Sequence, residues 1–232
     1  MLSNIIAICN QKGGVGKTTT AINLAAALAG AGKKILIIDL DPQGNASTGL
    51  GIDYANRDKS IYEVLASSIA FDESVSKTNL ENLFIIPSNV ELSGIEPELA
   101  NESDKAFVLK SLINNSNSIK TFDYIFIDCP PALSLLTVMA MTSANSVLVP
   151  LQCEFFALEG LSQLIKTVDR VQKNLNPSLS IDGIILTMFD KRNKLSTQVA
   201  MDVKKHLQEK VFETMIPRNV RVSEAPSFGM PA

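Results

Sequence analysis

The chain has 232 residues, of which 46% are hydrophobic, and a formal net charge of −3. This length allows one sizeable α/β domain, and the negative balance means that any nucleic-acid binding must use a local basic patch. No apolar run approaches the ~18 residues of a membrane span, and the N-terminal run is too short for a signal peptide. The three cysteines are far apart in sequence. Their spacing predicts buried thiols in a reducing cytoplasm and does not suit an iron–sulfur cluster.

The most informative stretch is a glycine-rich turn near the N-terminus. Residues 5–8 are apolar and predict a buried strand, and residues 21–29 predict a helix. A glycine-rich turn between a strand and a helix can cradle phosphates. Lys17 would reach the β- and γ-phosphates of a nucleotide, and the Thr18 hydroxyl would ligate Mg²⁺. The turn reads Lys12-Gly13-Gly14-Val15-Gly16-Lys17-Thr18-Thr19.

The residue just before this turn departs from the usual phosphate-loop pattern. The common pattern has a glycine five residues before Gly16, and this chain has Gln11 there. A second lysine, Lys12, follows directly. Its place within the turn favours a functional role over that of an ordinary surface charge.

Two further apolar runs end in aspartate. Residues 35–39 predict a strand that leads into Asp41 and the turn residues up to Asn45, and residues 124–128 predict a strand that ends in Asp128. Carboxylates at the carboxyl ends of parallel strands lie on the ligand-binding edge of an open α/β sheet. Asp128 is therefore a candidate for the Mg²⁺ site, as in a Walker B strand.

The rest of the chain alternates between strand-like and helix-like segments. This alternation predicts an α/β fold, a doubly wound and mainly parallel sheet with helices on both faces, in one domain over residues 1–232. Residues 50–82 have little pattern and are expected at the periphery. We expect strands at 83–87, 146–151, 181–188 and 212–216, helices at 61–65, 91–114, after 160 to about 175 and at 196–210, and loops at 114–118 and 217–229.

Five of these segments occur in the order found in the ParA/MinD family of P-loop ATPases. Residues 12–18 resemble the deviant Walker A box of that family, residues 39–45 its switch I and residues 128–131 its switch II. Residues 152–160 and 217–229 are similar to two further signatures. The chain as a whole looks like a chromosome-partitioning ATPase of the ParA/Soj type.

The resemblance implies roles for individual residues. Asp41 would position and polarise the attacking water, and Lys12 would cross a dimer interface to the phosphates of a second subunit. Pro217 and Asn219 would contact the adenine base, while Glu154 could bond a ribose, bond a partner subunit or only begin a helix. The resemblance implies catalytic residues Lys12, Lys17 and Asp41, nucleotide-binding residues Gly13, Gly14, Val15, Gly16, Lys17, Thr18 and Thr19, and Mg²⁺ ligands Thr18, Asp41 and Asp128.

The resemblance also implies cofactors and partners. Such proteins bind ATP and Mg²⁺, form an ATP-dependent homodimer, bind DNA without sequence preference and are stimulated by a ParB-type partner, so a cytoplasmic, nucleoid-associated protein is expected. The alternative is a MinD-like ATPase that cycles on membranes. Family members usually continue with a strand and a helix beyond the point where this chain stops, so the domain is expected to lack both.

Charge distribution favours the DNA-binding alternative. From Met188 onward there are eight lysine or arginine residues and five acids, a net charge of +3, so the preceding residues carry −6. Such polarity predicts an electrostatic DNA face rather than a membrane surface. The candidate DNA contacts are Arg192, Lys191 and Arg221.

Overall fold

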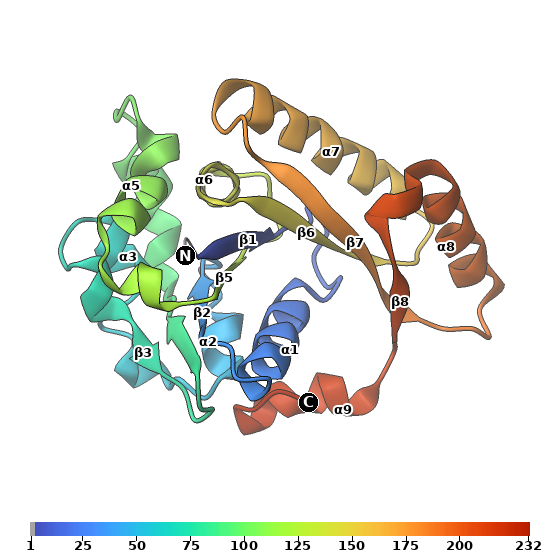
Figure 1. Ribbon diagram of the computed structural model, residues 1–232, viewed down its shortest axis with the longest axis horizontal. Coiled ribbons are helices and arrows are strands. Elements are labelled where there is room, and N and C mark those ends of the chain that lie inside the picture. The colour runs from blue at the N-terminus through green and yellow to red at the C-terminus, as the bar shows by residue number, and fades with distance from the viewer. Residues whose placement is uncertain (1–2) are drawn as a thin grey trace.

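The computed structural model describes residues 3–232, which fold around an eight-stranded sheet (Figure 1). The strand order is β3-β4-β2-β5-β1-β6-β7-β8, and neighbouring strands are parallel except β3 and β4. The predicted fold class is therefore confirmed. The strands are β1 (Asn4–Ile8), β2 (Ile35–Asp39), β3 (Ser76–Lys77), β4 (Leu83–Ile86), β5 (Tyr124–Asp128), β6 (Ser146–Gln152), β7 (Ser180–Phe189) and β8 (Val211–Pro217).

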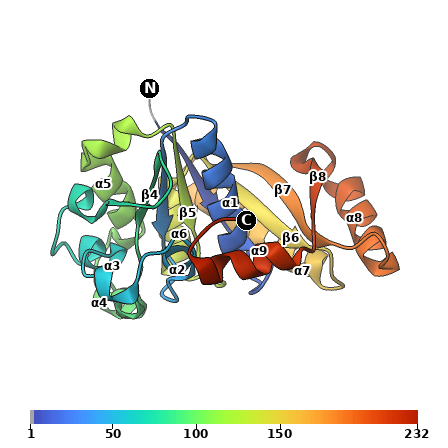
Figure 2. The same cartoon turned by 90° about the horizontal axis from the view of Figure 1, so that it is seen from below.

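Helices cover both faces of the sheet. The face that carries Ile6 and Ile8 packs against α1 and α2, and α9 lies on the same side (Figures 1 and 2). The face that carries Ala7 packs against α3 and α5 to α8. The central strands are apolar throughout because both of their faces are buried. The helices are α1 (Lys17–Gly30), α2 (Asn45–Gly49), α3 (Ile61–Leu65), α4 (Ile95–Glu98), α5 (Val108–Asn115), α6 (Leu135–Ser143), α7 (Ala157–Asn174), α8 (Lys194–Leu207) and α9 (Val220–Glu224).

The predictions for residues 91–118 were wrong in detail. A continuous helix was expected over 91–114, but the structure has the short 3-10 helix Val90–Gly94, then α4, a polar turn at 101–104, and α5. Gly94 and the run of Asn, Glu, Ser and Asp at 101–104 favour turns and interrupt the helical pattern. The expected loop at 114–118 is partly helical, because α5 continues to Asn115.

Other differences concern short elements. Residues 217–229 were expected to form a loop, but they contain α9 and a 3-10 helix, Ala225–Phe228. The side chain of Asn219 starts α9 by accepting a hydrogen bond from Arg221 N at 2.9 Å. Helices α2 and α6 and strand β3 were not predicted. Sequence periodicity is weakest for segments of so few residues, as in α2 and β3.

Burial of the cysteines agrees with the prediction. Cys9, Cys129 and Cys153 are all buried free thiols, and the first two have their sulfur atoms 3.2 Å apart at the ends of β1 and β5. None of the helices within residues 3–232 has the length and apolar composition needed to cross a bilayer.

Candidate functional site

The glycine-rich turn joins the end of β1 to the start of α1. Gly16 precedes the helix with φ of +89°, in the left-handed region where a side chain would strain the backbone. This conformation lets α1 begin directly at Lys17. The unpaired N–H groups of the first helical turn therefore face the same space as the loop. Such a site attracts an anion.

Two neighbouring strands hold the turn in place. The Asn10 side chain donates to Pro150 O of β6 at 2.7 Å and accepts from Lys12 N at 3.1 Å. The Thr187 hydroxyl of β7 donates to Val15 O at 2.7 Å. The turn is therefore fixed to the sheet at both of its ends before any ligand binds.

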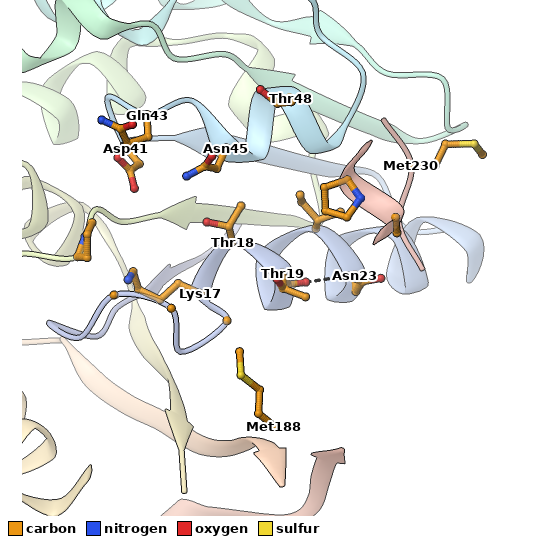
Figure 3. Close-up of a pocket in the computed structure, with 17 residues that line it drawn as sticks. Lys17, Thr18, Thr19, Asn23, Asp41, Gln43, Asn45, Thr48, Met188 and Met230 are labelled. Carbon is orange, nitrogen blue, oxygen red and sulfur yellow. Dashed lines mark hydrogen bonds between the residues drawn. The ribbon is translucent and has the colours of Figure 1, made fainter. Parts of the chain in front are cut away.

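A cleft of about 410 Å³ lies between this turn and the loop that follows β2. We call residues 41–48 the switch loop. Asp41 and other polar side chains of the switch loop face Lys17 and Thr18 across the cleft (Figure 3). Of the residues of the turn expected to bind the nucleotide, those that line the cleft are Gly13, Gly14, Gly16, Lys17, Thr18 and Thr19, whereas Val15 is buried. Asp41, expected to act in catalysis and to bind Mg²⁺, also lines the cleft.

Lys17 is held under the turn. It is only 7% exposed, and its Nζ donates to the carbonyl oxygen of Lys12 at 3.3 Å. Burial lowers the pKa of Lys17, while the charges of Asp128 and Asp41 oppose that shift. A buried ammonium beside carboxylates is well placed to balance the charge of a phosphate group.

Two buried aspartates occupy the ends of adjacent strands. Asp39 of β2 and Asp128 of β5 are paired in register, and both are fully buried. Asp39 accepts from the backbone N and hydroxyl of Ser47, at 2.8 and 2.7 Å. Burial raises the pKa of Asp39 to about 6. Sequence reasoning gave Asp39 no role, yet this residue anchors the start of α2.

Asp128 differs from Asp39 because neither of its carboxylate oxygens has a hydrogen-bond partner. Burial, and then the charge of Asp39, raise the pKa of Asp128 well above its usual range, whereas the nearby Thr18 and Lys17 lower it. A buried carboxylate without a partner is costly unless a cation completes it. Asp128 and the Thr18 hydroxyl are hard oxygen donors, which fit Mg²⁺.

The protein alone does not form a closed metal cage at this position. Within residues 3–232, no group of three His, Cys, Asp or Glu side chains is arranged to hold an ion. Mg²⁺ is usually bound by one or two carboxylates together with substrate phosphates and water, rather than by protein ligands alone. The donors present therefore suit a metal that arrives with a nucleotide.

The switch loop has an anchor that the sequence did not reveal. Arg57 is 6% exposed and donates to Gly44 O at 3.3 Å, Ser88 O at 3.3 Å, Thr48 Oγ1 at 2.8 Å and Ile52 O at 2.7 Å. Four acceptors from three segments meet one guanidinium. Ile52, Thr48 and Gly44 lie 5 to 13 residues before Arg57 and Ser88 lies 31 residues after it, at spacings that match no recognised motif, so a single arginine in a weakly patterned stretch gave no signal.

A second cavity, of about 470 Å³, adjoins the first. Pro217 and Asn219, the expected base contacts, both line this cavity. The two cavities share Gly16, Thr19, Asn23 and Met188 in their walls. Phosphate and base candidates therefore lie on either side of the beginning of α1.

The Lys12 side chain does not line the phosphate cleft and instead contacts another segment of its own chain. Its ammonium forms an ion pair with Glu154, and both side chains are close to 40% exposed. Phe155 and Phe156 follow Glu154 directly and are 73% and 64% exposed. The predicted contact of Lys12 with a second subunit is not tested by a single chain, and the pair with Glu154 was not predicted.

Comparison with known proteins identifies the family. A family model described as AAA domain matches residues 3–181. The chain is 54% identical over 227 residues to chromosome partitioning protein ParA of Caulobacter vibrioides, covering 98% of this chain and 85% of that protein. It is 50% identical over 230 residues to sporulation initiation inhibitor protein Soj of Bacillus subtilis, covering 99% and 90%. The chain belongs to the ParA/Soj family of ATPases.

A solved structure supports the same assignment of the fold. Cobyrinic acid a,c-diamide synthase from Mycobacterium smegmatis, with a bound ATP analogue and magnesium, superposes with a TM-score of 0.87 at 35% identity. The match covers 98% of this chain and 93% of that one. The ParA/Soj chain therefore shares its whole sheet with a nucleotide-binding relative.

The basic residues expected to bind DNA lie outside the nucleotide site of this ParA/Soj chain. Arg192 is exposed and pairs with Asp190 through two hydrogen bonds of 3.0 and 2.9 Å, and these bonds lower the pKa of Asp190 to about 2. Lys191 is also exposed, and Arg221 is exposed on α9. Their role stays a prediction, and the pairing of Arg192 with an acid was not foreseen.

Proposed function

We propose that the protein is a partition ATPase that binds ATP with Mg²⁺, dimerises in that state and then binds DNA without sequence preference. Hydrolysis, stimulated by a ParB-type partner, would release the DNA. One observation carries the proposal. Lys17, Thr18 and Asp41 converge on a single cleft, next to the buried and unpartnered carboxylate of Asp128.

Each group in the cleft has a distinct part in this proposal. The N–H groups of the turn and of the first turn of α1 bind the phosphates, and Lys17 balances their charge. Thr18 and Asp128 hold Mg²⁺, which neutralises charge on the phosphate oxygens when bound. Asp41 lies across the cleft and orients the attacking water, consistent with its position at the cleft wall.

Lys12 couples hydrolysis to dimerisation. In one chain it pairs with Glu154, and such half-exposed pairs contribute only about 0–1 kcal/mol. The pair can therefore open when a second copy presents a triphosphate. A cation supplied by the partner would stabilise the charge that develops on the transferred phosphoryl group. The names of the relatives support chromosome partition as the process served.

Binding assays can separate DNA binding from the membrane alternative. The protein is incubated with a random DNA duplex or with anionic liposomes, each with and without ATP and Mg²⁺. We expect ATP-dependent retention on DNA that falls steeply with salt, through counterion release, and no ATP-dependent retention on liposomes.

Two variants complete the experiment. Lys17→Ala should lose ATP-dependent binding, because a hydrogen bond to a charged group contributes up to about 3 kcal/mol. Lys33→Ala, an exposed lysine beyond the end of α1, serves as the control and should behave as wild type. Retention on liposomes alone would favour the membrane-cycling alternative, and retention without nucleotide would contradict the proposal.

A further inference from the structure

Strand β7 contains an irregularity next to the nucleotide cleft. Leu186 pairs with Met215 of β8, and Phe189 pairs with Pro217. The first strand therefore advances three residues while the second advances two, which is the signature of a β-bulge. Within this interval Met188 has φ of +50°, a left-handed conformation that non-glycine residues rarely adopt.

The bulge changes the face on which Met188 lies. Regular alternation would place Met188 with Leu186, in the core under α7 and α8, and would turn Phe189 toward α1. Instead Phe189 joins the core that contains Leu186. Thr187 and Met188, two consecutive residues, both lie on the α1 side, where Thr187 bonds Val15 and Met188 lines the cavities.

Met188 lies where the two cavities meet. It lines both the phosphate cleft and the cavity that contains Pro217 and Asn219. A Cβ atom at Gly16 would be 3.9 Å from its terminal methyl group, so the thioether reaches the turn itself. Figure 3 shows this side chain beside the turn, on the side away from Asp41.

The left-handed backbone at Met188 is energetically unfavourable. A left-handed conformation of a residue with a side chain costs about 1–2 kcal/mol, and such residues cluster where ligands bind. A thioether is apolar and polarisable, and it contacts flat aromatic rings favourably. The bulge thus presents an aromatic-binding group at the junction of the two cavities.

We propose that Met188 is a base-binding residue that packs against the base of the nucleotide held by the glycine-rich turn. The inference rests on the proposed nucleotide binding and adds a base contact that the sequence motifs did not suggest. Because Met188 would contact only the base, it should raise the affinity for a nucleotide and not for a ligand that has phosphates alone.

The test compares two ligands that share phosphates but not a base. Affinities of wild type and of Met188→Ala for Mg²⁺–ATP, and for Mg²⁺ with inorganic tripolyphosphate at millimolar concentration, are measured by displacement of a fluorescent ADP analogue. We expect Met188→Ala to bind ATP about five- to tenfold more weakly, since it loses thioether contact area. Tripolyphosphate affinity should stay within about twofold, because the Gly16 turn is unchanged.

Two further variants control for structure. Met188→Leu keeps an apolar side chain and should retain most of the ATP affinity. Met201→Ala removes a methionine that is 60% exposed on α8 and should have no effect. Equal losses for ATP and tripolyphosphate would show that Met188 only supports the turn, and unchanged ATP affinity in Met188→Ala would also overturn the inference. If wild type itself fails to bind ATP, the proposed function fails instead.

Discussion

Three aspartates meet at the carboxyl edge of the sheet, and their partners differ. Asp39 is bonded to Ser47, Asp128 has no partner, and Asp41 accepts one hydrogen bond, from Gln43 N at 3.0 Å. Asp39 is thereby committed to holding α2. In the proposed function, the free carboxylate of Asp128 would bind a cation and the remaining oxygen of Asp41 would orient water.

This division predicts the behaviour of Asp41 variants. Asp41→Asn keeps an oxygen that can accept from Gln43 N, but it loses the carboxylate charge. We expect nearly unchanged ATP affinity and a fall of about 100-fold or more in ATP turnover, the usual scale for a lost general base. Phosphate release under saturating ATP measures the effect, and Asp41→Ala should be as slow. Near wild-type turnover in Asp41→Asn would assign Asp41 to the turn alone.

Individual residues also show how much of the site could be predicted from the sequence. Lys17, Thr18 and Asp128 were predicted because each lies in a local motif whose spacing reflects its chemistry. Arg57 and Met188 were not singled out, since Arg57 meets Ser88 and Met188 lies beside Gly16 only in the folded chain. A lone arginine and a lone methionine carry no periodic signal.

At the scale of elements, the switch loop is fixed from outside the site. Arg57 holds this loop by bonds to Gly44 and Thr48, and also to Ile52 and Ser88.

Helices and strands, like single residues, were predicted well where the signal is local and poorly where it depends on the folded chain. Long apolar strands were predicted closely because burial on both faces leaves an unbroken apolar run. Short elements such as α2 form because tertiary partners hold them.

Gly44→Ala tests the anchor of the switch loop. Gly44 has φ of +62°, and an added Cβ would lie 2.4 Å from Arg57 Nη1. We expect the free energy of unfolding to fall by about 1–3 kcal/mol, from the left-handed backbone and the displaced guanidinium. Urea denaturation measures the change.

Its control is Gly30→Ala, at the end of α1, where a Cβ would meet nothing within 4 Å. Alanine in a helix loses less entropy, so this variant should be unchanged or more stable by up to about 1 kcal/mol. Gly44→Ala should cost less when introduced into an Arg57→Ala background than into wild type, because the guanidinium that it displaces is already absent. If Gly44→Ala unfolds like wild type, Arg57 does not fix the loop.

At the scale of the whole molecule, the proposed role of Lys12 is to connect the nucleotide site to a second copy. Lys12→Ala should bind ATP with little change yet remain monomeric, because the cation that would reach the partner's phosphates is missing. Light scattering with and without ATP measures this, with Lys33→Ala as the control. Stability should change by less than about 1 kcal/mol, since only a half-exposed ion pair is lost. If Lys12→Ala forms dimers at the same ATP concentration as wild type, the proposed role of Lys12 is wrong.

The basic segment makes a separate prediction about DNA. Arg192 shares its charge with Asp190, so Asp190→Asn should strengthen binding to random duplex severalfold, and Arg192→Glu should weaken it by at least about tenfold at low salt. Lys120→Glu is a matched charge change in the 3-10 helix Ser118–Thr121, which precedes the amino end of β5, whereas Arg192 follows the carboxyl end of β7, so this control should have a smaller effect. ATP turnover without DNA should be equal in all three. Equal DNA affinities for Arg192→Glu and Lys120→Glu would place the contact elsewhere.

The buried cysteines have a practical consequence for studying two chains at once. All three thiols are buried, and burial raises the pKa of Cys153 to about 11 and that of Cys129 well above its usual range. Thiol reagents react with exposed thiolates, so we expect them to leave the three natural cysteines of the folded chain unlabelled. A cysteine introduced at Phe155, beside Glu154, would take a fluorophore at one chosen point, and energy transfer between labelled copies would report their meeting in real time.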